Sequence, residues 1–292
     1  MGVLCQNTEI DRMRSYSNIF SRSVFMNIMK FHSFSTINLI GHTYDAEFLS
    51  SGNITYREYL THIYRELLKN YRCEYIYKNL IINSLISKYK TKDTVVLNEF
   101  KVGDSVADIA LFNGKSRVYE IKTDLDTPKR LSSQLRDYMR FFQECYVVIP
   151  ENLYDEYNTF LDERVGIIAL CGNGLRTCLK TKRSAIVNTD VDLEVLRKTL
   201  WISEYEAIVQ SYFSELPDVG YYEMYDACYE KISQIPSKAL SSIVTEVIKK
   251  RKNYTLALRN YDKSLRQICL ALKISPSQYD DLFESLNKVI SI

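Results

Sequence analysis

The sequence predicts an α/β protein with a mixed β-sheet and flanking helices, followed by a helical C-terminal domain. Between residues 55 and 170, amphipathic stretches alternate with short apolar runs of strand length, in the order helix, three strands, helix, strand, helix, strand. From about residue 190 the pattern is helical to the end. We therefore expect a helical or irregular N-terminal extension at residues 1–54, an α/β core at 55–185 and the helical domain at 186–292.

Helices are expected before the first strand. Residues 55–70 place Tyr59, Ile63 and Leu67 on one apolar stripe, and a second helix is expected from about residue 74 to residue 89. The runs at 95–100, 105–112 and 117–122 then have the length and composition of strands. Asn113-Gly114 between the last two is a strong signal for a β-hairpin.

The second half of the core begins with a helix. Thr127 is a good N-cap and Pro128 is tolerated at the first helical position, so we expect this helix to run from here to about Phe142. The apolar runs at 145–149 and 165–170 predict two further strands, with a short helix near 153–162 between them. Strands joined both by a hairpin and by helices favour a mixed sheet.

Composition argues against several classes of protein. The net charge of +2 over 292 residues is too small to indicate nucleic-acid binding by itself, so a phosphate-binding surface requires local clustering. The seven cysteines are odd in number and include no CxxC pair, which argues against a disulfide framework or zinc site and favours reduced thiols in a cytoplasmic protein. No apolar signal core and no run of about 18 apolar residues is found, so we expect no membrane span.

Three charged residues of the predicted hairpin suggest chemistry. Asp108 lies on one strand, and Glu120 and Lys122 lie on the other, two residues apart and therefore on one face. Such a group on a buried face is costly unless it is paired or bound to a cation. Magnesium prefers oxygen ligands, lowers the pKa of a bound water and polarises a phosphoryl oxygen. Lys122 would then orient that water or stabilise charge developing on a phosphate.

The register of the hairpin tests this interpretation. A two-residue turn at Asn113-Gly114 would place Asp108 opposite Tyr119, on the wrong face for Glu120. A three-residue loop at 112–114, with a left-handed glycine, places Asp108 opposite Val118 and one diagonal step from Glu120. The catalytic interpretation therefore predicts a loop of odd length or a bulge, and an even register would contradict it.

Polar residues also recur on the helix that follows. Arg130, Gln134 and Tyr138 are spaced i, i+4, i+8, and so form a polar seam beside the apolar stripe of this helix. The seam either positions a substrate phosphate or a water, or is a solvated helix face.

Basic residues gather near the C-terminus. The cluster Lys249, Lys250, Arg251 and Lys252 either contacts phosphates or forms a solvated helix face. Residues 264–286 have the spacing of a helix-turn-helix, which reads DNA in some proteins and is a plain helical hairpin in others.

The order of these residues resembles the PD-(D/E)xK nuclease superfamily. Residues 74–149 are most similar to an uncharacterised bacterial and phage family within it. The matching stretches are Glu74–Asn79, Leu97–Phe100, Val106–Ile109, Tyr119–Thr123 and Arg130–Leu135. One departure is Ala107, which stands where the superfamily name has proline.

The resemblance implies a fold, a cofactor and roles for individual residues. The fold would be a restriction-endonuclease-like core with a central four-stranded mixed sheet, and the cofactor one or two Mg²⁺ (or Mn²⁺) ions. Asp108 and Glu120 would be metal ligands and Lys122 the catalytic lysine. Glu74 and Glu99 match positions of an auxiliary acid, counted with the metal ligands, and Gln134 matches a frequent active-site residue on the helix.

These observations together lead us to expect a magnesium-dependent nuclease that hydrolyses phosphodiester bonds, most often in DNA. One alternative is a nuclease-like fold that binds nucleic acid or a protein without cutting. Another is a regulatory or phage-defence component whose helical C-terminal domain binds another protein or a second copy of the chain. A third is structural: Glu120 and Lys122 would form a simple ion pair on one face of the sheet.

Overall fold

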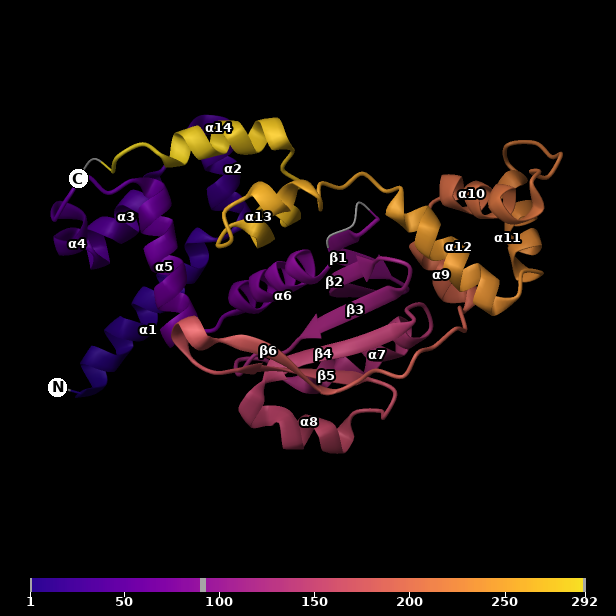
Figure 1. The fold of residues 1–292 in the computed structure, drawn as a ribbon, viewed down its shortest axis with the longest axis horizontal. Helices are drawn as coiled ribbons and strands as arrows, with labels where there is room; N and C mark the ends of the chain where they lie inside the picture. Colours follow the sequence, from indigo (N-terminus) through magenta and orange to yellow (C-terminus); the bar gives the residue numbers. More distant parts are fainter. Residues whose placement is uncertain (1, 90–92, 291–292) are drawn as a thin grey trace. The chain divides into compact units, whose positions relative to one another are not determined.

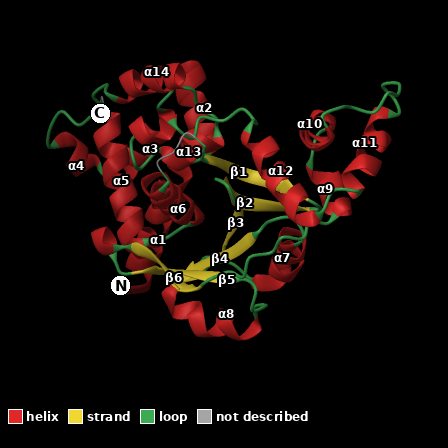
Figure 2. Ribbon diagram, turned by 45° about the vertical axis from the view of Figure 1, so that its right-hand side comes forward, coloured by secondary structure: helices red, strands yellow, loops and turns green. Residues whose placement is uncertain are grey.

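The computed structural model of the chain describes residues 2–89 and 93–290 (Figure 1). Six strands form one sheet in the order β1-β2-β3-β4-β5-β6 (Figure 2). Their bounds are β1 Val95–Val102, β2 Ser105–Phe112, β3 Ser116–Ile121, β4 Glu144–Pro150, β5 Gly166–Cys171 and β6 Cys178–Arg183. The pairs β1–β2 and β2–β3 are antiparallel and β3–β4 is parallel, so the predicted mixed α/β sheet is confirmed.

Helices precede, interrupt and follow the sheet. The α-helices before β1 are α1 Gly2–Ile19, α2 Arg22–Phe31, α3 Ser35–Tyr44, α4 Ala46–Ser50, α5 Tyr56–Asn70 and α6 Glu74–Lys88. Between strands lie η1 Pro128–Arg130, α7 Leu131–Met139, η2 Glu151–Leu153, α8 Tyr154–Phe160 and η3 Gly174–Arg176, where η denotes a 3₁₀ turn. After β6 come α9 Leu193–Thr199, α10 Ile202–Phe213, α11 Met224–Ser233, α12 Ser237–Lys249, η4 Ala257–Asn260, α13 Arg266–Ala271 and α14 Pro276–Leu286. In the described part of the chain, no helix combines the length and the hydropathy needed to cross a membrane.

The chain forms two compact units, each built from separate stretches of sequence. We call Met1–Lys88, Leu170–Leu179 and Tyr254–Ile292 the terminal unit, and Tyr89–Ala169 and Lys180–Asn253 the central unit. The three predicted domain ranges were consecutive, whereas these units join distant segments. The physical reason is that apolar faces are buried against whichever element fits them, regardless of distance along the chain.

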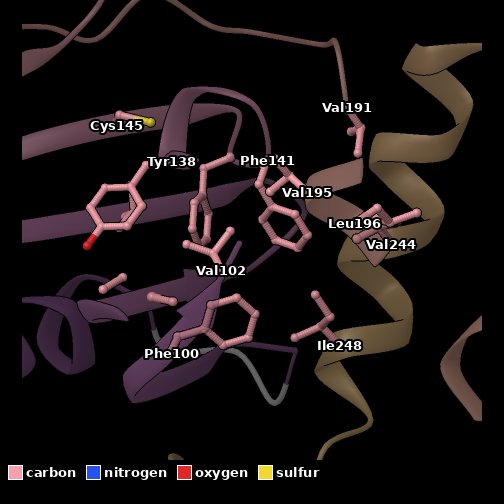
Figure 3. Packing of buried hydrophobic residues seen from close by; sticks show 14 of the residues in the cluster. Phe100, Val102, Tyr138, Phe141, Cys145, Val191, Val195, Leu196, Val244 and Ile248 are labelled. Atoms are coloured by element: carbon pink, nitrogen blue, oxygen red, sulfur yellow. The ribbon is translucent and has the colours of Figure 1, made fainter. Parts of the chain in front are cut away.

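The core of the central unit combines strands with the later helices. Figure 3 shows Phe100 and Val102 of β1 together with Leu196 of α9 and with Val244 and Ile248 of α12, all of them buried. Helix α7 contacts β2 and β4, and α12 contacts β2. Helices α9 to α12, predicted as part of a separate helical domain, therefore belong to the same unit as the sheet that carries Asp108.

Contacts between residues far apart in the sequence hold the terminal unit together. An isolated β-bridge joins Thr55 to Val289, and Arg57 donates to both carboxylate oxygens of Asp262 at 2.8 and 2.9 Å. The predicted helix-turn-helix at 264–286 contains two helices, α13 and α14, and a capping box at Ser275 starts the second. Whether this pair reads DNA stays a prediction.

Candidate functional site

The hairpin between β2 and β3 has the odd-length loop that the sequence predicted. The ladder runs from Ile109 opposite Tyr119 to Phe112 opposite Ser116, which leaves the three residues 113–115 as the loop. Gly114 adopts φ +84°, a left-handed conformation that suits glycine. The loop lies one residue later than the predicted loop at 112–114. The observed ladder, continued by one residue, therefore places Asp108 directly opposite Glu120 rather than opposite Val118. Directly opposed residues share one face of the sheet.

This face of the hairpin packs into the apolar core of the central unit. Ala110 and Phe112, two and four residues after Asp108, are fully buried, as is Val118, two residues before Glu120. Leu131 and Leu135 of α7 belong to the same buried cluster. The carboxylates therefore lie where the apolar core covered by α7 gives way to polar side chains.

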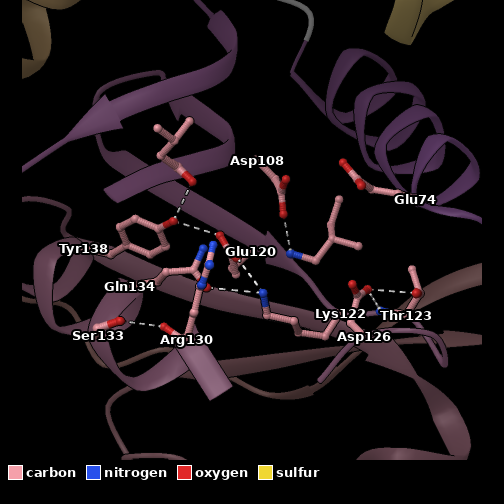
Figure 4. Close-up of polar contacts among 12 residues, drawn as sticks. Glu74, Asp108, Glu120, Lys122, Thr123, Asp126, Arg130, Ser133, Gln134 and Tyr138 are labelled. Atoms are coloured by element: carbon pink, nitrogen blue, oxygen red, sulfur yellow. Dashed lines mark hydrogen bonds and ion pairs between the residues drawn. The ribbon is translucent and has the colours of Figure 1, made fainter. Parts of the chain in front are cut away.

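Hydrogen bonds connect the charged residues to one another and to α7 (Figure 4). The Lys122 ammonium donates to Glu120 Oε1 at 2.9 Å and to Gln134 Oε1 at 3.2 Å. The Tyr138 hydroxyl oxygen lies 2.8 Å from Glu120 Oε2, and the Ile121 backbone N–H donates to Asp108 Oδ2 at 2.8 Å. The structure thus brings together Asp108, Glu120, Lys122 and Gln134, as the sequence predicted.

Glu120 is a buried carboxylate next to a second carboxylate. Glu120 as a whole is 2% exposed, and the Lys122 side chain is 12% exposed. Burial raises the pKa of Glu120 and the Asp108 carboxylate raises it further, against the opposing effects of Lys122 and Tyr138. A cation beside the two carboxylates would stabilise their ionised forms, so the local charge fits a divalent metal with oxygen ligands.

The carboxylate pair is small for a metal centre. Across residues 2–89 and 93–290, no group of three or more His, Cys, Asp or Glu side chains is arranged to hold a metal ion. Two carboxylates suffice for Mg²⁺ when waters and substrate phosphate oxygens supply the remaining ligands. A metal ion at Asp108 and Glu120 would therefore need further ligands from waters and substrate phosphate oxygens.

The two predicted auxiliary acids, Glu74 and Glu99, lie on different elements, and only the position of Glu99 is set by the register of the sheet. Glu74 begins α6 in the terminal unit, where its largely exposed side chain pairs with the buried Lys78. Its predicted role as a metal ligand stays a prediction. Glu99 lies on β1 between Asn98 and Phe100, which pair with Ile109 and Ala107, so the register sets Glu99 opposite Asp108.

Glu99 has an unusual backbone conformation. Its φ is +51°, in the left-handed region, where a residue with a side chain is less stable than glycine by about 1 kcal/mol.

Because asparagine tolerates the left-handed region better than glutamate, Glu99→Asn is expected to raise the free energy of unfolding by about 0.5–1 kcal/mol. Urea unfolding measures this change. Lys101→Asn, at an exposed position of the same strand without positive φ, is the control and should not stabilise; equal destabilisation by both variants would contradict the strain.

Two residues predicted to contact nucleic acid, the fully buried Tyr138 and the half-buried Arg251, direct their polar groups to partners within the protein instead. Tyr138 is 0% exposed, and its hydroxyl is held between Glu120 and the Val106 carbonyl oxygen. Arg251 directs its guanidinium to the buried Glu204 carboxylate at 2.6 and 2.8 Å. Spacing along α7 shows that Tyr138 shares a face with Gln134 but not that this face turns inward, and Arg251 lies beyond the end of α12.

Three of the other predicted nucleic-acid contacts are exposed, and the fourth, Lys249, is half-buried. Arg130 is exposed at the end of η1, immediately before α7. Lys249 pairs with Glu246 at 2.8 Å, and Lys250 and Lys252 are exposed after α12 ends. Their phosphate contacts stay predictions. The bond between Tyr138 and Glu120 was missed, although its signal was present in the i, i+4 spacing from Gln134.

The fold and the site define a mixed α/β protein with a carboxylate–lysine cluster at one end of its core. The family described as Bacteriophage P4 protein cII matches residues 68–272, a range that includes all of this cluster, and the chain belongs to that family. Protein cII of Enterobacteria phage P4 is 25% identical over 181 residues, which cover 61% of this chain and 67% of that protein. A solved structure of SPO1766, a protein of unknown function from Silicibacter pomeroyi, aligns with a TM-score of 0.32 and 11% identity, covering 49% of this chain and 93% of the other.

Proposed function

We propose that this chain is a metal-dependent nuclease of the PD-(D/E)xK type that hydrolyses phosphodiester bonds, with DNA as the first substrate to test. The observation that supports the proposal most is the register that sets Asp108 opposite Glu120, with Lys122 on the same face. The three residues come from two strands, and a helix adds Gln134 to the same group. A convergent set of carboxylates and an ammonium beside a core is the arrangement that this chemistry requires.

Each residue has a distinct part in the proposed reaction. Asp108 and Glu120 would hold Mg²⁺ or Mn²⁺, which when bound activates a water and polarises the phosphoryl oxygen. The Lys122 ammonium stabilises negative charge that develops on the phosphate, or orients the attacking water. Gln134 accepts a hydrogen bond from Lys122, and so limits where the ammonium can point. Tyr138 acts as a positioning residue, because its hydroxyl contacts the Glu120 carboxylate.

One observation favours a second candidate, a binding module that does not cut. Both oxygens of Glu120 already have partners, Lys122 for one and Tyr138 for the other. A carboxylate whose oxygens are engaged in this way is also what a structural ion pair would look like. In that case the nuclease-like sheet would bind nucleic acid or a protein partner, and the cluster would serve stability alone.

A cleavage assay separates these candidates. The full chain is incubated with supercoiled plasmid, single-stranded DNA and RNA, in Mg²⁺, Mn²⁺ or EDTA. We expect cutting with either metal and none with EDTA, and we expect Glu120→Gln to abolish it because the substitution removes a charged ligand while keeping the shape. Binding without cutting by the wild-type chain would select the binding module. Equal cutting by the wild-type chain and by Glu120→Gln would rule out this site.

A further inference from the structure

Arg266, at the start of α13 in the terminal unit, is a buried guanidinium whose hydrogen-bond partners are all uncharged. Arg266 as a whole is 8% exposed. Its Nη1 donates to Asn83 Oδ1 at 3.0 Å, and its Nη2 donates to the Arg259 carbonyl oxygen at 2.9 Å. Its Nε has no hydrogen-bond partner among the described residues. Two of the five N–H groups of this guanidinium are therefore used, and neither of their acceptors carries a negative charge.

A buried cation without a paired anion is unfavourable, because burial removes its hydration. Burial accordingly lowers the pKa of Arg266, against the opposing effects of Tyr279 and Asp262. Asp262 does not form an ion pair with Arg266, because both of its carboxylate oxygens accept hydrogen bonds from Arg57, at 2.8 and 2.9 Å. An anion that bound to Arg266 would offset this cost of burial.

The surroundings of Arg266 are basic and reach the surface of the terminal unit. Asn83, its partner on α6, is half-buried and donates through Nδ2 to the carbonyl oxygen of the exposed Lys263 at 3.0 Å. The guanidinium therefore lies directly beneath surface residues. Along residues 254–273 the one acid is Asp262, and the basic residues are Arg259, Lys263, Arg266 and Lys273. A local excess of positive charge attracts anions to such a surface.

We propose that Arg266 is the centre of an anion-binding site that takes a phosphate group, with Asn83 and Lys263 at its rim. The Nε and Nη donors of a guanidinium form a planar fork that matches two phosphate oxygens. Phosphate is favoured over a carboxylate because several cations, rather than one, lie along this segment. Because Nε is covered, we expect the half-buried Asn83 side chain to move when the phosphate binds.

This site does not depend on the proposed nuclease reaction. Arg266 belongs to the terminal unit, whereas Asp108 and Glu120 belong to the central unit. The proposal is therefore tested by binding alone, and its failure would leave the nuclease proposal as it stands.

Isothermal titration of the full chain with inorganic phosphate, at constant ionic strength, tests the site. We expect saturable binding, which Arg266→Met weakens by about tenfold or more because methionine has no donors. Lys263→Gln, at an exposed position, should weaken it by about twofold to fivefold. Lys69→Gln alters an exposed lysine of α5 in the same unit and is the control, which should leave the affinity unchanged. Binding is the readout because phosphate also stabilises proteins by exclusion from their surfaces.

Two further titrations identify the source of the phosphate. A nucleoside monophosphate represents a free phosphate monoester, and a single-stranded oligonucleotide without terminal phosphates represents a nucleic-acid backbone. The ligand whose affinity falls most with Arg266→Met is the one that the site takes.

A second variant covers the case in which Arg266→Met does not fold, which circular dichroism would show. Arg259→Gln combined with Lys263→Gln changes two residues that are not buried and should weaken phosphate binding by about fivefold or more. If none of the three ligands binds saturably, or if these variants bind all three as tightly as the wild-type chain does, the site at Arg266 is disproved.

Discussion

Lys122→Met is expected to lower the rate of phosphodiester hydrolysis by about 100- to 1,000-fold while the chain stays folded. The reason is that the ammonium is the one positively charged group that contacts Glu120 in the described structure, and methionine keeps the length of the side chain without its charge. Initial rates on plasmid with Mg²⁺ measure the loss. Circular dichroism and the unfolding midpoint show whether the fold survives. Lys129→Met, at an exposed lysine of η1 just before α7, is the control and should retain activity.

A double substitution distinguishes catalysis from structural pairing. Lys122→Met leaves the 2% exposed Glu120 without its cation and should therefore lower the free energy of unfolding. Adding Glu120→Gln removes the unpaired charge, so the double variant should regain most of that stability. Activity should stay lost in both variants, because neither restores the ligand or the ammonium. Recovery of cutting together with stability would mean that the pair is structural and that the chemistry lies elsewhere.

Arg251→Ala is expected to lower the free energy of unfolding by about 3–5 kcal/mol. Glu204 is 5% exposed, and Arg251 donates to both of its carboxylate oxygens. The guanidinium also stacks over the rings of Trp201 at 4.5 Å and Phe100 at 5.1 Å, so truncation removes a cation–π contact along with the ion pair. Urea unfolding with a constant m-value measures the loss.

Two further variants test the cause of that loss. Lys250→Ala alters the exposed neighbouring residue and should change stability by less than about 0.5 kcal/mol. Arg251→Met combined with Glu204→Gln removes both charges and keeps much of the volume, so it should be more stable than Arg251→Ala. If Arg251→Ala changes stability no more than Lys250→Ala does, the buried pair does not hold this region together.

The hairpin and its register could be predicted because they depend on local sequence. Asn113-Gly114 specifies a tight connection, and a period of two specifies the faces of the strands on either side. Together these features showed that Asp108 and Glu120 can share one face of the sheet only if the loop has an odd length. The exact loop could not be fixed in this way, because loops at 112–114 and 113–115 satisfy the same alternation.

Other parts of the fold depend on contacts that no local pattern reports. Strand β6 has the sequence Cys-Leu-Lys-Thr-Lys-Arg, and its half-exposed position at the sheet edge gives it no apolar run to detect. The inward turn of Arg251 depends on Glu204, which lies 47 residues away. A run of basic residues in the sequence indicates neither which acidic residue pairs with one of them nor how far its side chain is buried.

The division into two units has a consequence for the order in which they can form during synthesis. The central unit is complete once residue 253 has been made, whereas the terminal unit still lacks Tyr254–Ile292. Until then Thr55 and Arg57 have neither Val289 nor Asp262 to bind. Since domains generally fold as units when their residues become available, the ribosome finishes the unit that carries Asp108 and Glu120 first. The opening helices of the chain, although translated earliest, are the last to find all their partners.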